Sequence, residues 1–285
     1  MALADQSTNA QAQPEHGERA RPFPAPHLIV LLAVLAALAF LIAMPGGLLG
    51  AADMIAYAVC HRIASHSFTI GGRQLPLCAR CTGTFSGALI GLLGQALVLR
   101  RGKASRFPPT AIVVLTVLFI AIMAADGLNS YISLIPNAPY LYEPQNWLRL
   151  LTGSLNGLAM STLIYPIFNV TLWLKPTEER TIRDMRDYAV LLGLNLGAVA
   201  LILTGWSPFL YPIALASVVG ILTLLTATNT MIFAMIIRRE NVVENWRQAI
   251  IPVLAGLTIS LFQIGAIDLL RFALTGTLNG IPTLR

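Results

Sequence analysis

The sequence predicts an all-α, polytopic transmembrane helix bundle of about seven spans. Its 285 residues are 56% hydrophobic and only 11% charged, whereas a soluble domain carries roughly 25% charged residues. The mean hydropathy of +0.71 also excludes disorder over most of the chain, because disordered segments combine low hydrophobicity with high net charge. Apolar runs recur along the chain, with lengths near the roughly 20 residues that cross a hydrocarbon core.

The net charge of +6 does not indicate nucleic-acid binding. Lys and Arg occur mostly in short clusters between apolar runs, which is the pattern that orients membrane spans. A nucleic-acid-binding protein would instead gather them on a soluble face. We therefore expect membrane lipid, and no nucleic acid, among the partners.

The chain divides into an N-terminal tail, one transmembrane domain and a C-terminal tail. Residues 1–26 lack periodicity and are expected to form a disordered cytoplasmic tail. The domain covers residues 27–273 and the C-terminal tail covers 274–285. The first span is the apolar run 28–44; a cleaved secretory signal is the competing interpretation, which the long leading segment disfavours. Six further spans are expected at 81–99, 110–125, 147–174, 188–205, 209–237 and 249–273.

The distribution of Lys and Arg orients these spans. Three connections are rich in Lys and Arg, namely 100–109, 175–187 and 238–248. Two alternate connections contain neither residue type, namely 126–148 and 206–208. Because positively charged loops resist translocation, the sequence predicts a cell (inner) membrane protein with a cytoplasmic N-terminus.

One segment opposes this orientation. Residues 45–80 would lie outside the cytoplasm, yet they contain Arg62, Arg73 and Arg80. Since these arginines lie among the cysteines described below, we expect them to have a local role there.

Small residues recur at helical spacing on three predicted spans. They are Gly83, Gly87 and Gly91, then Gly153, Gly157 and Ser161, then Gly193 and Gly197. In a bilayer such faces allow helix backbones to approach closely. Packing within the bundle is the favoured interpretation, and a homodimer through these small-residue faces is the alternative.

The three cysteines, Cys60, Cys78 and Cys81, all fall in one short stretch beside His61. Cysteines used only for packing would be scattered along the spans. Three thiolates and one imidazole suit tetrahedral zinc, so we expect Cys60, His61, Cys78 and Cys81 to bind zinc. His66 is a second candidate donor.

Two other interpretations of the cysteines stay open. Cys78 and Cys81 form a Cys-x-x-Cys step near the start of a span, where the helix dipole favours a thiolate. They are therefore candidate catalytic residues of a thiol-disulfide oxidoreductase that exchanges electrons with a membrane quinone. A structural disulfide with one spare thiol is the remaining interpretation.

These motifs resemble a family of bacterial and archaeal multi-pass membrane proteins that is grouped only as a domain of unknown function. The resemblance covers about residues 55–160. It rests on Cys60-His61, on the stretch Cys78-Ala79-Arg80-Cys81-Thr82-Gly83, on Asp126-Gly127, and on an Asn-x-x-Arg-x-x-Thr-Gly step from Asn146 to Gly153. It strengthens the site but implies no reaction.

A set of polar residues is expected on the same outer face as the cysteines. The predicted topology places Asp126, Asn129, Asn146 and Arg149 there, and Asn156 shares the helix face of Arg149. Because charges at membrane depth are costly unless they are paired or functional, these five residues are candidates for a binding pocket. The alternative is a structural ion pair between Asp126 and Arg149.

A second charged pair is expected near the end of the last span. Asp268 and Arg271 are spaced three residues apart, which places them on one helix face as an ion pair.

The favoured function is therefore that of a membrane protein with an extracytoplasmic zinc site above a polar pocket. The quinone-linked oxidoreductase is the first alternative. A small-solute or lipid transporter with Asp126 and Asn156 on its path is the second alternative. Whether the protein is an enzyme, and on what substrate, is left open.

Overall fold

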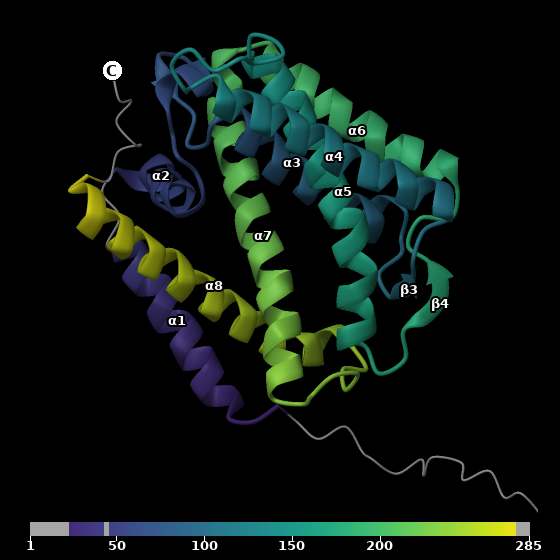
Figure 1. Cartoon of the computed structure of the whole chain (residues 1–285). Helices are drawn as coiled ribbons and strands as arrows, with labels where there is room; N and C mark the ends of the chain where they lie inside the picture. The colour runs from purple at the N-terminus through teal and green to yellow at the C-terminus, as the bar shows by residue number, and fades with distance from the viewer. Residues whose placement is uncertain (1–22, 43–45, 278–285) are drawn as a thin grey trace, which may run out of the picture.

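The computed structural model describes residues 23–42 and 46–277. Most of the predicted tail over 1–26, and residues 278–285 of the C-terminal tail, therefore lie outside the described residues. The helices, in chain order, are α1 (Pro26–Ile42), α2 (Gly47–Val59), α3 (Ala79–Leu93), α4 (Thr110–Ile132), α5 (Asn146–Leu172), α6 (Met185–Leu203), α7 (Leu210–Ile236) and α8 (Trp246–Thr275) (Figure 1).

The prediction of a helical membrane protein is confirmed, and six of the roughly seven predicted spans correspond to helices long enough to cross a membrane. Among the described residues, six helices are long and apolar enough to cross a membrane, and two shorter apolar helices precede them. The six later runs correspond to α3–α8, with α3 continuing as the π-helical segment η2 (Gly94–Val98). The first predicted span corresponds to α1, whose 17 residues extend only about 26 Å at 1.5 Å per residue.

Helix α2 was not predicted. Its 13 residues lie inside the segment 45–80, which we expected to form a loop. A single acidic residue, Asp53, and the two glycines Gly46 and Gly47 break up the apolar pattern there. The helix is short enough that packing, rather than its own propensity, determines whether it forms.

The centre of the bundle is the contact between α3 and α5, where the predicted small-residue faces meet. A Cβ atom added at Gly83 would overlap the carbonyl oxygen of Leu150, and one added at Gly157 would overlap that of Thr84. The backbones therefore approach as closely as glycine allows. Gly193, on α6, has no such neighbour within 4 Å, so this small-residue face is open.

The three basic connections meet at one end of the bundle. Strand β3 (Ala104–Arg106) pairs in parallel with β4 (Thr177–Arg180), which joins the first basic connection to the second. The third is joined by a bridge between Trp173 and Val243 and by a hydrogen bond of 2.7 Å that Lys103 Nζ donates to the carbonyl of Glu244. These contacts place all three connections together.

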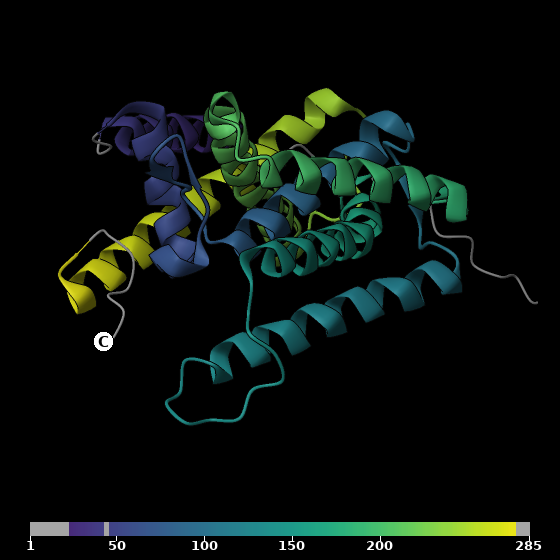
Figure 2. The same ribbon diagram turned by 90° about the horizontal axis from the view of Figure 1, so that it is seen from above.

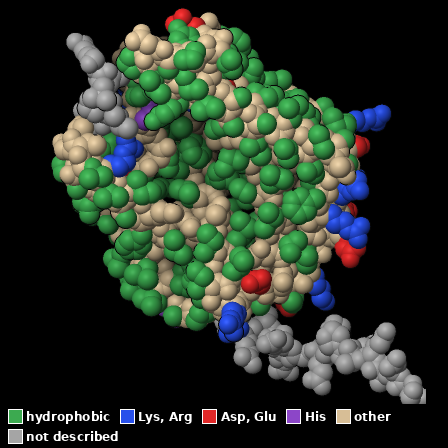
Figure 3. Space-filling view, in the orientation of Figure 1, with side chains coloured by type: hydrophobic (Ala, Val, Ile, Leu, Met, Phe, Trp, Pro, Cys, Tyr) green, Lys and Arg blue, Asp and Glu red, His purple; other side chains and the backbone are tan. Residues whose placement is uncertain are grey.

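The outer surface is apolar over the length of the helices. Hydrophobic side chains cover most of the face seen in Figure 3, and charged side chains gather near its edge. Seen from above, α4 lies along one side of the group of helices (Figure 2), and many of its large side chains, such as Val114, Val117 and Leu118, are exposed. This surface has the character of a lipid-facing one.

Candidate metal centre

The three cysteines meet where α2 ends and α3 begins. Cys60 follows the last residue of α2, Cys78 immediately precedes α3, and Cys81 lies in the first turn of α3. The chain between them returns on itself through a hairpin, β1 (Thr69–Ile70) with β2 (Arg73–Gln74). Its two central residues are glycines with positive φ angles of 57° and 77°, the geometry that a tight hairpin turn requires.

Cys60, His61 and Cys78 form a cluster that can hold a metal ion. Their donor atoms all lie within 4.8 Å of one another. A tetrahedral ion with bonds of about 2.0–2.3 Å separates its donors by about 3.3–3.8 Å. The ligands would therefore need to close by at most about 1–1.5 Å, a movement within the reach of side-chain rotation.

The Cys81 thiol lies next to this cluster but is not among the three donors that lie within 4.8 Å of one another in the described residues. Hydrogen bonds from the thiols of Cys78 and Cys81 lower the pKa of Cys60 against the opposing effect of burial. The same hydrogen bond to Cys60 is the largest cause that raises the pKa of Cys78 to about 11. The three thiols are free and share protons around one sulfur, which is an arrangement that a metal ion replaces by displacing those protons.

Backbone N–H groups also point at the Cys60 sulfur. The N–H of Cys78, at the start of α3, donates to Cys60 Sγ at 3.2 Å, and the N–H of Arg62 donates at 3.4 Å. Hydrogen bonds to the charged form of a thiol stabilise that form. The N-terminus of α3 adds its positive dipole end, so this position favours a thiolate.

His61 is neutral but its hydrogen bond competes with metal binding. Burial lowers the pKa of His61 and lowers that of His66 to about 4, so both imidazoles are neutral near pH 7. Nδ1 of His61 accepts the N–H of Ile63 at 3.0 Å, which assigns the proton to Nε2. Coordination through either nitrogen breaks this hydrogen bond, since Nδ1 must then bind the metal or carry the proton.

His66 lies beside His61 without joining the donor cluster. The two rings meet edge to face with centroids 5.5 Å apart. His66 therefore contacts the first imidazole from outside the sulfur cluster.

Three guanidinium groups surround the site. The charges of Arg80, Arg149 and Arg271 all act on His61. Zinc with three thiolates and one imidazole carries a net charge of −1, and positive side chains nearby would offset it. The electrostatic surroundings therefore suit an anionic metal–thiolate centre.

The ion-pair partner of Asp126 is Arg80, and not Arg149 as one interpretation of the sequence had it. Asp126 is only 2% exposed, and Arg80 approaches its Oδ2 with a nitrogen–oxygen distance of 2.5 Å. The hydroxyl of Tyr142 donates to Oδ1 at 2.7 Å, and that of Thr152 donates to Oδ2 at 3.2 Å. The network fixes the side chain of Arg80, which lies between Cys78 and Cys81 in the sequence. The sequence could not decide between the two guanidinium groups, because Arg80 and Arg149 were both expected on the same outer face as Asp126.

Asn146 and Arg149 support the cysteine loop. The Asn146 amide donates to the carbonyl of Ser65 at 3.1 Å, and Arg149 donates to Asn146 Oδ1 at 2.9 Å. Arg149 is 5% exposed, and its Nε has no hydrogen-bond partner among the described residues. The second sequence motif therefore fastens α5 to the loop that carries the histidines.

The other two residues of the predicted pocket have separate roles. Asn129 binds the loop after α4, accepting the N–H of Leu141 at 2.7 Å and donating to the carbonyl of Tyr142 at 2.9 Å. Asn156 is buried further along α5 and donates to Met160 Sδ at 3.5 Å. Of the five predicted residues, Asp126 contacts Arg80 of the cysteine motif, Asn146 contacts the loop before it, and Arg149 reaches that loop only through Asn146. That the five form a binding pocket stays a prediction.

The arginines that opposed the predicted orientation have acidic partners. Arg62 and Arg73 reach the two carboxylate oxygens of Asp53, on α2, at 2.7 and 2.8 Å. With Arg80 paired to Asp126, each arginine between 45 and 80 has an acidic partner, and because Arg62 and Arg73 share one carboxylate the group keeps a net charge of +1. The acidic residue in α2 was the signal in the sequence that could have revealed this.

The expected pair between Asp268 and Arg271 is not formed. Arg271 instead donates to the carbonyls of Tyr57 and, at 2.9 Å, of Cys60, and its guanidinium lies over the Tyr57 ring. It therefore caps the C-terminus of α2, where carbonyl groups lack partners and the helix dipole is negative.

The fold and this cluster define a multi-pass membrane protein with a Cys/His site that can hold a metal. Residues 60–163 match DUF2085, a family of predicted membrane proteins. The chain is 29% identical over 110 residues to the uncharacterized protein MJ1492 of Methanocaldococcus jannaschii, an alignment that covers 39% of this chain and 64% of that relative's length. No solved structure matches. The family match confirms the resemblance predicted from the motifs and ends within α5.

Proposed function

We propose that this protein binds one zinc ion through Cys60, Cys78, Cys81 and His61, and that the zinc fastens the α2–α3 connection to the bundle. The observation that carries the proposal is the convergence of the Cys60, His61 and Cys78 donor atoms within 4.8 Å. Thiolate and imidazole ligands select zinc over hard cations. Four protein donors would leave no open position, which favours a structural role.

Zinc content measured by mass spectrometry, with thiol titration of the same purified sample, tests the proposal. We expect about one zinc per chain and few titratable thiols, because zinc-bound thiolates are protected. Cys60→Ser, Cys78→Ser and Cys81→Ser should each lower bound zinc at least about tenfold. Thr82→Ser is a matched control. Thr82 is buried and follows Cys81 in the chain, but it is not one of the proposed zinc ligands.

The two histidines provide a second, sharper comparison in the same assay. His61→Ala should lower zinc affinity, whereas His66→Ala should leave the zinc content unchanged. Metal-free protein with a reducible bond between Cys78 and Cys81 would contradict the proposal. It would favour the quinone-linked oxidoreductase, for which these two cysteines are the candidate catalytic residues.

We also propose that α1 crosses the membrane, which gives seven spans in the cell (inner) membrane with the N-terminus in the cytoplasm. Phe23, just ahead of α1, packs with Trp173 and Val243, where the basic connections meet. The zinc site would then lie on the extracytoplasmic side. The exposed apolar side chains would face lipid, and a homodimer would use the open face at Gly193 and Gly197.

Reporter tags test this topology. Tags at the N-terminus and at Lys103 should report the cytoplasm, and tags at Gly71 and Ala138 should report the opposite side, because basic connections stay inside. The N-terminus and Gly71 on the same side would mean that α1 does not cross.

A further inference from the structure

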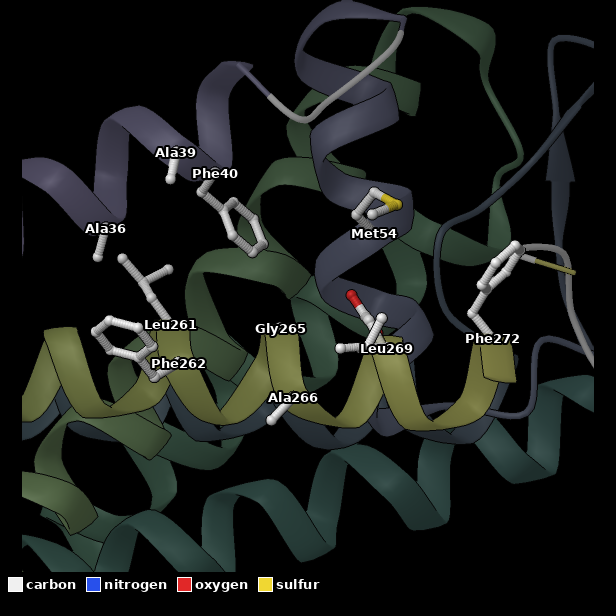
Figure 4. Close-up of a pocket in the computed structure, with 11 residues that line it drawn as sticks. Ala36, Ala39, Phe40, Met54, Leu261, Phe262, Gly265, Ala266, Leu269 and Phe272 are labelled. Carbon is white, nitrogen blue, oxygen red and sulfur yellow. The ribbon is translucent and has the colours of Figure 1, made fainter. Parts of the chain in front are cut away.

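A cavity lies between α1, α2 and α8, and none of the cysteines or histidines of the metal centre lines it. It has a volume of about 560 Å³, within the range of roughly 300–1,000 Å³ that is typical of small-molecule sites. Phe40 of α1, Met54 of α2, and Phe262 and Phe272 of α8 line it (Figure 4). Because these helices are apolar on their outer faces, a ligand would reach the cavity from the lipid phase.

Asp268 is the polar group of this cavity. Among the eleven lining residues, it alone has oxygen or nitrogen in its side chain. It is 5% exposed, and neither carboxyl oxygen has a hydrogen-bond partner among the described residues. Arg271, the nearest candidate partner along α8, is engaged by the end of α2.

A buried carboxyl group without a partner is costly, and within a membrane span such a residue is by default a candidate functional site. A ligand that supplies a hydrogen bond to the carboxyl group lowers this cost. Packing of the chain does not supply it, since the neighbours on α1 and α2 that line the cavity are Ala36, Ala39, Phe40 and Met54.

We propose that this cavity binds a neutral, membrane-dissolved molecule with a long apolar body and one hydroxyl group, and that the hydroxyl donates to Asp268. The apolar lining matches the body, and the single acceptor group matches one O–H donor. An ammonium group fits less well, because the two carboxyl oxygens would still leave at least one of its three N–H donors without a partner in an apolar wall. This site is independent of the proposed zinc function.

Photolabelling of the purified full chain in lipid nanodiscs tests the proposal. The probes are a long-chain alcohol that carries a diazirine and the methyl ether of the same compound. We expect the alcohol to label the stretch from Leu261 to Phe272 about tenfold more than the ether, as one buried hydrogen bond implies. Asp268→Leu should abolish this preference, whereas Asp268→Asn should retain part of it.

A variant that narrows the cavity provides the matched control. Gly265 lines the cavity, and a Cβ atom there would meet nothing within 4 Å, so Gly265→Leu should occupy the space one helical turn from Asp268, leave the fold intact and sharply reduce labelling. Gly193→Leu makes the same change on α6 and should label like the wild type. Equal labelling by alcohol and ether would mean that ordinary acyl chains occupy the cavity and would overturn the proposal, as would undiminished labelling of Gly265→Leu. Zinc content, measured in parallel, should not change.

Discussion

Replacing Gly157 by valine is expected to separate α3 from α5 and to destabilise the protein strongly. An added Cβ atom would overlap the Thr84 carbonyl oxygen and lie 2.7 Å from the Ala88 nitrogen. Both atoms belong to the backbone of α3 and cannot rotate away. Overpacking typically costs about 1–3 kcal/mol and sometimes more; with clashing backbone on one side we expect at least about 3 kcal/mol. A thermal melt in detergent should show the midpoint lowered by roughly 6 °C or more.

The matched control, Gly193→Ala, is not expected to destabilise the protein. Gly193 lies in the helical part of α6 with open space around its Cβ position, so Gly193→Ala should leave stability unchanged or raise it by up to about 1 kcal/mol. An unchanged melting midpoint for Gly157→Val would contradict the close contact between the two helices.

The spans were predictable because each apolar run carries its own signal. Lipid requires every spanning segment to be long, apolar and internally hydrogen-bonded, so the run 110–125 identifies α4 without reference to any other helix. Helix α2 was not predictable in this way. Its 13 residues include Asp53, whose meaning emerges only once Arg62 and Arg73 lie next to it.

The cysteine cluster was predictable because its members flank one short connection. Cys60 and Cys78 are 18 residues apart, and a hairpin between them returns the chain to its starting point. The partner of Asp126 was not predictable, because Arg80 and Arg149 lie on two different helices and either could face it. Only the packing of α3, α4 and α5 together decides which guanidinium reaches the carboxylate.

Replacing Asp126 by alanine is expected to destabilise the protein by about 3–5 kcal/mol, because it leaves the Arg80 guanidinium without its buried partner. Arg80 is 18% exposed and Asp126 2% exposed, so water does little to compensate. Since Arg80 lies between Cys78 and Cys81, zinc content should fall in the same variant. The melting midpoint and the bound zinc, measured on one preparation, check both effects.

Two comparisons test whether the loss of stability comes from this buried ion pair and not from the loss of any charged side chain. Asp53→Ala removes an acidic partner of Arg62 and Arg73 that is 25% exposed, and exposed pairs contribute only about 0–1 kcal/mol. The double variant Asp126→Leu/Arg80→Leu should be more stable than Asp126→Ala, because replacing both members of a buried pair by apolar side chains removes the unpaired charge. A double variant no more stable than Asp126→Ala would mean that the two side chains are not coupled. Bound zinc that stays low in the stable double variant would then show that Arg80 acts on the cysteines through its charge, and not only by holding α3 in place.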